Sequence, residues 1–155
     1  WEIQTFGMDG TLRRIVRRPH TMRLVGDDLK SAYEEWTLDR MGSSPEFSPE
    51  VLARVRERLE STPYADTLAA IGRLLVDDER RLWVGGPSFG TPNSPNVIPG
   101  PVTWSVFDMD GRWLSDVEIP ERRALVEVSR GRAWVITIDA LDVKEILAYE
   151  IETGG

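Results

Sequence analysis

The sequence predicts a mainly β protein of short antiparallel strands, interrupted once by two helices. Two observations carry this prediction: runs of β-forming residues alternate with tight-turn signals along most of the chain, and several run–turn–run segments occur twice. Only the stretch 20–66 departs from the pattern, because its apolar residues recur at helical spacing. We therefore expect about two antiparallel four-stranded sheets with a two-helix insertion.

The first repeated segment contains an Asp-Gly turn. Phe-Gly-Met-Asp-Gly at 6–10 recurs as Phe-Asp-Met-Asp-Gly at 107–111, and each copy is closed by a proline nine residues after its last glycine. Asp-Gly between two strand-like runs is a strong hairpin signal, because a type I′ turn needs positive φ at both central residues. The repeat predicts hairpins over 5–16 and 102–119, each with a type I′ turn.

The second repeated segment carries a tryptophan. The run LLVDDERRLWV at 74–84 is similar to LVEVSRGRAWV at 125–135, and each predicts a strand, a charged tight turn and another strand. Trp83 and Trp134 hold equivalent positions 51 residues apart, so we expect both to pack between sheets. The alternating run 143–151 supplies a last strand.

In chain order, the strands form a repeating unit of four: two strands in 2–18, four in 71–119 and three in 124–151. This period with its recurring tryptophan favours a partial β-propeller, with a β-sandwich as the alternative. The predicted divisions are the last two strands of one blade (1–19), a helical insertion (20–66), a complete blade with a long Pro/Gly-rich loop at 85–101 (67–120), a final three-stranded partial blade (121–152) and a tail (153–155).

Two short helices are expected within the insertion. Gly26-Asp27-Asp28 offers an N-terminal cap, and one helical face then follows at Leu29, Ala32, Tyr33 and Trp36. Trp36 lies on this apolar face, and we expect it to dock the insertion on the rest of the fold. Ser48-Pro49-Glu50 is a second start signal, with serine at the cap and proline at the first helical position.

Composition excludes several classes of function. The formal net charge of −7 disfavours a general nucleic-acid role, because phosphate binding needs a positive surface. The chain has no cysteine, which excludes disulfides, thiol catalysis and cysteine–zinc sites, and no apolar run approaches the roughly 20 residues of a membrane span. The chain opens on Trp1 without an initiator methionine, so we expect a piece of a longer protein or a processed product. Two basic clusters are expected to be solvated faces: Arg13, Arg14, Arg17 and Arg18, and then Arg54, Arg56 and Arg58.

The Phe-x-Met-Asp-Gly segments with their closing prolines, together with the strand–turn–Trp segment 74–84, resemble the C-terminal part of a bacterial six-bladed β-propeller of the NHL-like, often uncharacterised type. The resemblance covers about 1–19 and 63–152. It implies a propeller architecture and favours a periplasmic or secreted location, but it implies no activity, because propellers host unrelated functions. About nine strands are fewer than a closed ring contains, so open blade edges that could pair in self-association are expected.

No catalytic, metal-ligand or cofactor constellation is identified. Asp108-x-Asp110-Gly111 resembles the beginning of a calcium loop but lacks the further ligands, so a hairpin turn is expected. The acidic cluster 77–79 is expected to be a solvated turn, and His20, the only histidine, a surface or structural residue. Some six-bladed propellers are metal-dependent lactonases. The residue types of such a site occur here without a recognisable spacing, at Asp66, Asn93, Asn96 and Asp139.

Strand alternation predicts where a binding site would lie. The insertion 20–66 and the loop 85–101 both connect strands at the same end of the sheets, opposite the short Asp-Gly turns. Long loops on a rigid scaffold commonly carry function. We expect a non-catalytic binding or scaffold module with no cofactor, whose partner is a protein or small ligand contacted by Phe89, Asn93 and Asn96; a metal-dependent lactonase-like or lyase-like enzyme is the alternative. Equally, the helices and the loop could merely cover the open end of the blades.

Overall fold

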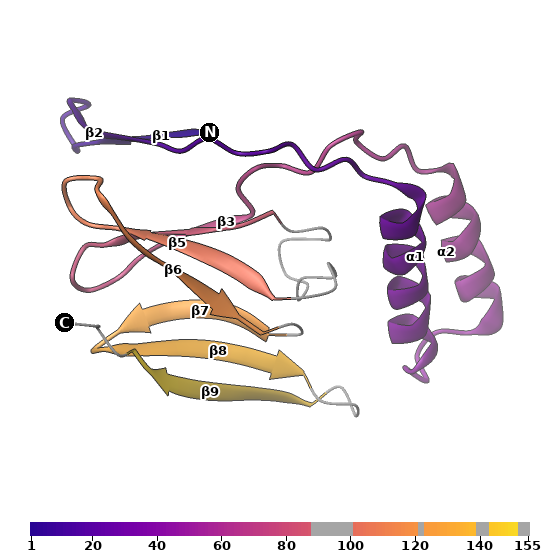
Figure 1. Ribbon diagram of the computed structural model, residues 1–155. Coiled ribbons are helices and arrows are strands. Elements are labelled where there is room, and N and C mark those ends of the chain that lie inside the picture. The colour runs from indigo at the N-terminus through magenta and orange to yellow at the C-terminus, as the bar shows by residue number, and fades with distance from the viewer. Residues whose placement is uncertain (88–100, 121–122, 139–142, 152–155) are drawn as a thin grey trace.

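The computed structural model describes residues 1–87, 101–120, 123–138 and 143–151 (Figure 1). Strands account for 41% of the structure and helices for 22%, which confirms the predicted mainly β class with two helices. The described residues form nine strands: β1 (Glu2–Phe6), β2 (Leu12–Arg17), β3 (Arg73–Val76), β4 (Leu82–Gly85), β5 (Val102–Phe107), β6 (Trp113–Ile119), β7 (Arg123–Ser129), β8 (Arg132–Ile138) and β9 (Lys144–Glu150).

The strands form three antiparallel sheets, each with its strands in chain order. The first sheet is β1–β2, the middle sheet is β3–β4–β5–β6, and the last sheet is β7–β8–β9. These are the two, four and three strands that the repeats predict. The sheets lie one above another in chain order from the top to the bottom of Figure 1. The described residues form these three sheets without closing them into a ring.

Two apolar layers hold the stack together. Along β4, Leu82 and Val84 face the first sheet, whereas Trp83 faces the last sheet, as the period-2 alternation of a strand requires. The layer between the first and middle sheets contains Trp1, Ile3, Val16, Ile71, Leu82, Val84 and Phe107. The layer between the middle and last sheets contains Leu75, Trp83, Val102, Trp104, Val106, Val117, Ile119, Leu125, Val128, Ala133, Val135 and Ile151. Sheet-on-sheet packing is therefore the main source of burial.

The Asp-Gly hairpins form as predicted, but their turns are not type I′. Gly10 has a φ of 77° and Gly111 a φ of 82°, whereas Asp9 and Asp110 do not have positive φ. The loops are one residue longer than a two-residue turn, since the N–H of Gly10 donates to the carbonyl of Gly7 at 2.9 Å, and only the glycine after this turn needs the left-handed conformation. Positive φ at both central residues occurs instead between β7 and β8, at Arg130 (53°) and Gly131 (70°).

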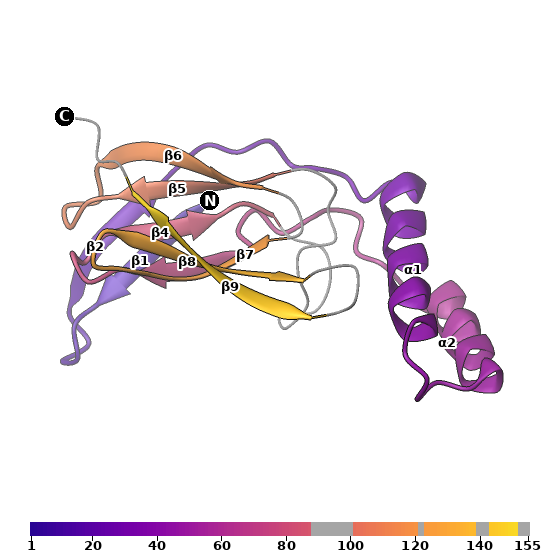
Figure 2. The same ribbon diagram turned by 90° about the horizontal axis from the view of Figure 1, so that it is seen from below.

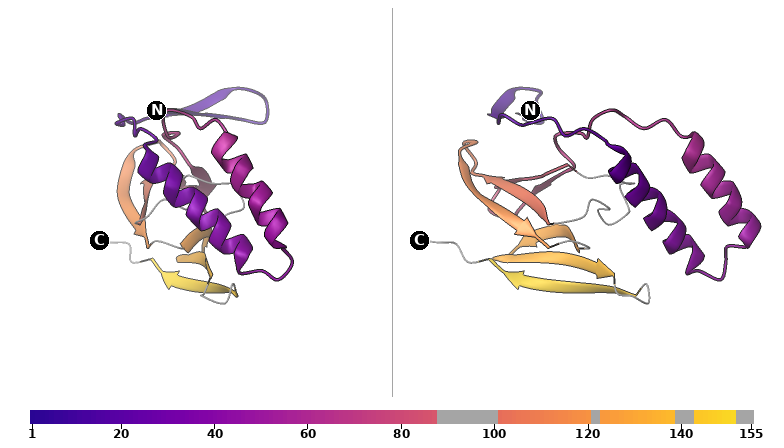
Figure 3. Two further views of the ribbon diagram at one scale, coloured as in Figure 1. Left: turned by 90° about the vertical axis from the view of Figure 1, so that its right-hand side faces the viewer. Right: turned by 45° about the vertical axis from the view of Figure 1, so that its right-hand side comes forward.

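The insertion forms two helices, α1 (Asp27–Gly42) and α2 (Pro49–Ser61). Gly26 occupies the N-cap of α1 without a side-chain hydrogen bond. The cap of α2 is the predicted one: the Oγ of Ser48 accepts the N–H of Val51, and Pro49 is the first helical residue. Figures 2 and 3 show the two helices side by side, standing away from the sheets. Neither helix in the described part of the chain is long and apolar enough to cross a membrane.

Candidate binding surface

The helices and the segment 88–100 attach at the same end of the middle sheet. The chain returns from α2 to β3 at Gly72, whose N–H donates to the carbonyl of Gly85 at the end of β4, at 3.0 Å. Val102, the first residue of β5, pairs with Ile119 at this end of the sheet. We call this the insertion end; the tight turns lie at the opposite end, the turn end. The flanks of both long connections therefore meet where the sequence predicts.

Two antiparallel chain segments form a stalk between the sheets and the helices. Leu24 and Thr67 form an isolated β-bridge. The N–H of Val25 donates to the carbonyl of Asp66 and the N–H of Leu68 to that of Arg23, each at 2.9 Å. The stalk thus holds both ends of the insertion together through its own hydrogen bonds.

A small apolar cluster joins the stalk to α1. It contains the buried side chains of Val25, Leu29 and Leu68, with the half-buried Tyr64 packed against them. The Tyr64 ring meets Tyr33 edge-on at 6.2 Å between centroids, and its hydroxyl donates to Oε1 of Glu34 at 3.3 Å. Burial, together with the neighbouring Glu34 carboxylate, raises the pKa of Tyr64 to about 12. These contacts fix the base of the helical pair.

Beyond this base, the helical pair is a thin, exposed structure, which we call the helical arm (27–61). Leu29 is the only buried residue of α1, and α2 has none. Within the described residues, neither helix lies beside a strand. The ring of Trp36 lies under the guanidinium of Arg40, with 5.3 Å from Cζ to the ring centroid, and its docking on the rest of the fold stays a prediction. The arm has nine acidic and five basic residues, a net charge of −4.

The predicted contact residues Phe89, Asn93 and Asn96 lie outside the described residues, as does Asp139. Asp66 is in the stalk, where its backbone carbonyl takes part in the pairing. The structure places the residue that ends β4 before the segment 88–100, Gly85, beside the start of β3.

Asp108 and His20 have local partners. Oδ1 of Asp108 accepts the N–H groups of Asp110 at 2.9 Å and Arg112 at 2.8 Å, so this carboxylate closes its own turn. Nδ1 of His20 lies 3.2 Å from the amino group of Trp1. The described residues contain no group of three or more His, Asp or Glu side chains that could hold a metal ion.

Sequence reasoning missed the role of Asp77. It was expected at a solvated tip, but its side chain is buried and accepts three hydrogen bonds, from Trp83 Nε1 (2.8 Å), Arg81 Nε (2.6 Å) and the Arg81 backbone N–H (2.8 Å). Asp78 and Glu79 are exposed, as predicted. The six-residue spacing from aspartate to tryptophan was the available signal, because the turn folds both side chains onto the same side of the hairpin.

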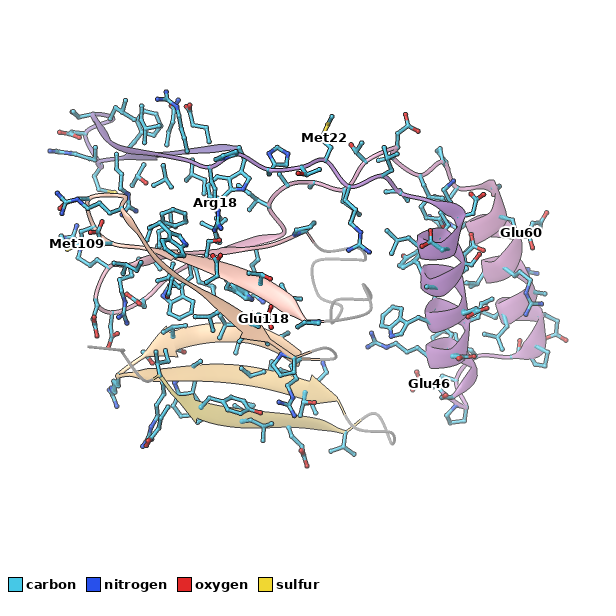
Figure 4. The ribbon with its side chains drawn as sticks, in the orientation of Figure 1. Arg18, Met22, Glu46, Glu60, Met109 and Glu118 are labelled. Carbon is cyan, nitrogen blue, oxygen red and sulfur yellow. The ribbon has the colours of Figure 1, made fainter. Side chains whose placement is uncertain are left out.

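The first arginine cluster is not simply a solvated face. Arg18 reaches from the end of β2 to the middle sheet (Figure 4), where it forms a bidentate pair with Asp116 at 2.7 and 2.9 Å and also donates to Ser105. Arg14 donates to the carbonyls of Asp108 and Met109, at 2.8 and 3.3 Å. Arg13 and Arg17 are exposed and pair with acids of their own hairpin. Half of this cluster therefore fastens one sheet to the next.

The comparisons with known proteins identify no relative: no family model matches the chain, and no curated protein or solved structure matches it.

Proposed function

We propose that this chain is part of a β-propeller-like scaffold that acts as a non-catalytic binding module, with its partner surface at the insertion end. The observation that carries the proposal is the helical arm, which is held by a paired stalk and stands apart from the strands of the described chain. Because the arm packs on no strand of the described chain, its faces are available for a partner. Its net charge of −4 favours a partner with a basic surface.

The sheet stack supports the scaffold part of the proposal. Repeated sheets of similar sequence lie face to face in chain order. Tight turns of the middle and last sheets also contact each other, since the side chain of Asp78 accepts the N–H of Arg130 at 2.7 Å. This is the arrangement expected of successive propeller blades. A rigid stack provides a fixed base for a projecting arm and for the segment 88–100.

The test compares the intact chain with a variant in which 27–62 is replaced by a short Gly-Ser turn. Because Val25 and Asp66 are already hydrogen bonded, the replacement can close without disturbing the stalk. Immobilised proteins would be used to capture partners from an extract of the source cells, followed by quantitative mass spectrometry. A partner that is retained by the intact chain and lost with the arm supports the proposal.

A matched control is Met8→Ser, because Met8 is a fully exposed apolar residue at the turn end. It should leave capture unchanged. Equal capture by the armless variant, or turnover of lactones by the intact chain in the presence of Ca²⁺, Mn²⁺ or Zn²⁺, would contradict a non-catalytic module that binds through its arm.

A further inference from the structure

Each sheet of the stack has two different faces. We call the side toward the preceding sheet the leading face and the side toward the following sheet the trailing face. In the middle sheet, Leu82 and Phe107 belong to the leading face and Trp83 to the trailing face. Within the chain, a trailing face always packs on the leading face of the next sheet. The first contact pairs Ile3 and Val16 with Phe107, and the second pairs Trp83 with the last sheet.

The trailing face of the last sheet has no covering sheet in the described structure. Ala133 and Val135 of β8 are buried against the middle sheet, so the alternate residues Trp134 and Ile136 lie on the opposite side. Cross-strand pairing extends this surface, because Trp134 lies opposite Ala148 and Ile136 opposite Ile146, whose side chain is 67% exposed. An apolar surface therefore covers the centre of this outer face.

The position of Trp134 in the repeat shows that this outer face corresponds to the trailing face of the middle sheet. The repeat places Leu82-Trp83-Val84 over Ala133-Trp134-Val135. Trp83 is 2% exposed because the last sheet packs on it, whereas Trp134 is only half-buried. The same type of face is thus covered by a sheet in the middle sheet, whereas in the last sheet no described strand covers it.

The other end of the stack exposes a leading face. In the first sheet, Ile3 and Val16 point toward the middle sheet, so the cross-strand pair Phe6–Leu12 and its neighbour Ile15 lie on the outer side. These three side chains are 55%, 45% and 37% exposed. Phe6 is the repeat equivalent of Phe107, which is buried at the contact between the first and middle sheets. One chain therefore presents both halves of the contact that it uses internally.

We propose that a second copy of this chain docks head to tail, with the leading face of its first sheet packed on the trailing face of the last sheet. This contact continues the established sheet-on-sheet packing with the same polarity. A symmetric contact between two Trp134 faces would pair two trailing faces, which occurs nowhere in the described chain. A head-to-tail dimer still has one uncovered leading face and one uncovered trailing face. The contact is therefore heterologous, and further copies can add to form a ring or an open chain.

The docking is separate from the helical arm and does not depend on the partner proposed for it. It also differs from pairing at strand edges, because it buries sheet faces and needs no new backbone hydrogen bonds. Exposed apolar patches of this kind commonly mark association surfaces in otherwise polar proteins. Association should therefore respond to charges placed on either face and be insensitive to changes at the stalk or the arm.

The experiment measures the mass of the full chain in solution by sedimentation velocity over about 1 µM to 1 mM, a range that resolves weak association. The intact 17.6 kDa chain should form species above the monomer as concentration rises. Trp134→Glu and Phe6→Glu should each raise the dissociation constant by about tenfold or more, because a carboxylate would be buried without a partner. Leu24→Glu, at an exposed apolar residue of the stalk, is the matched control and should not change association. Circular dichroism melts establish that each variant is folded.

Mixing the two variants gives the decisive measurement. The Trp134→Glu chain keeps its leading face and the Phe6→Glu chain keeps its trailing face, so an equimolar mixture should form a dimer of twice the monomer mass that cannot extend further. A monomeric intact chain over the whole range would overturn the proposal. It would also be overturned by a mixture that stays monomeric, or by association that Trp134→Glu abolishes and Phe6→Glu leaves unchanged, which is the signature of a symmetric contact.

Discussion

The indole N–H of Trp83 donates to Oδ2 of Asp77 at 2.8 Å, which fixes the buried tryptophan of the middle sheet to the turn that precedes its strand. The carboxylate is buried and also accepts both the side chain and the backbone N–H of Arg81. Turn geometry and sheet packing are therefore coupled through one side chain. A buried carboxylate is stable only while such partners are present.

Trp83→Phe tests this coupling. The substitution keeps an aromatic ring in the apolar layer but removes the hydrogen-bond donor from a buried, charged acceptor, so the free energy of unfolding should fall by about 1.5–3 kcal/mol. Urea unfolding followed by circular dichroism measures the change. Glu79→Gln, at an exposed residue of the same turn, should change the stability by less than about 0.5 kcal/mol. Equal effects of the two substitutions would show that the Asp77–Trp83 bond contributes nothing specific.

Arg80→Gly should stabilise the protein. Arg80 has a φ of 63°, in the left-handed region where the equivalent positions of two other turns carry Gly10 and Gly111. This conformation destabilises the folded state by roughly 1–2 kcal/mol at a non-glycine residue. Glycine removes that strain, but its greater freedom in the unfolded chain cancels part of the resulting gain in stability. We expect a net increase of about 0.5–1 kcal/mol in the free energy of unfolding. Arg80→Ala, which removes the side chain but retains the strain, should give no increase.

Gly10→Ala and Gly111→Ala form a pair that separates backbone strain from packing. Both glycines have positive φ, but a Cβ on Gly10 would meet nothing within 4 Å, whereas one on Gly111 would lie 3.2 Å from Cγ2 of Val16 and 3.3 Å from Cδ of Arg14. Both variants should lose about 1–2 kcal/mol through strain, and Gly111→Ala should lose roughly 1 kcal/mol more, because β2 must move from the turn. Thermal melts compare them, and equal losses would show that β2 does not press on this turn.

The Arg18–Asp116 pair makes stability depend on pH. The bidentate bond from Arg18, assisted by donors from Ser105 and Trp113, holds the pKa of Asp116 well below its ordinary value of 3.8. The folded state therefore binds fewer protons than the unfolded state. The stabilisation is present above about pH 4 and is lost as the pH falls through the pKa of the folded protein.

The comparison is the intact chain against Asp116→Asn, with unfolding followed between about pH 7 and pH 2. The difference in the free energy of unfolding should be about 1 kcal/mol at neutral pH, because both side chains remain about a third exposed and solvent screens the pair. It should shrink toward zero in acid. Arg17→Met, which removes an exposed ion pair near Arg18, should change the pH dependence of the free energy of unfolding much less. An Asp116→Asn difference that stays constant at every pH would contradict the role of Asp116 as the titrating group.

The sequence predicts the strands and both helices because their signals are local: alternation along each strand, Asp-Gly turns, and the Ser48-Pro49 helix start. It does not predict the burial of Asp77 or the reach of Arg18, because both depend on which sheet covers which face. The turn type between β1 and β2 was also missed, since Asp-Gly is compatible with loops of more than one length and the register is set by pairing along the whole hairpin. The contact residues Phe89, Asn93 and Asn96 remain predictions.

Removal of the helical arm should leave the sheets intact. Replacement of 27–62 by a Gly-Ser turn deletes Leu29 from the cluster at the stalk but keeps Val25, Tyr64 and Leu68 and the hydrogen bonds of the stalk. No described strand lies beside either helix, so the apolar layers between the sheets lose no partner. The far-ultraviolet helix signal should disappear while the unfolding midpoint of the sheets, followed by tryptophan fluorescence, changes by only a few degrees. If the chain no longer folds without its arm, the helices stabilise the sheets. That result would contradict the proposal that the arm is a surface available for a partner.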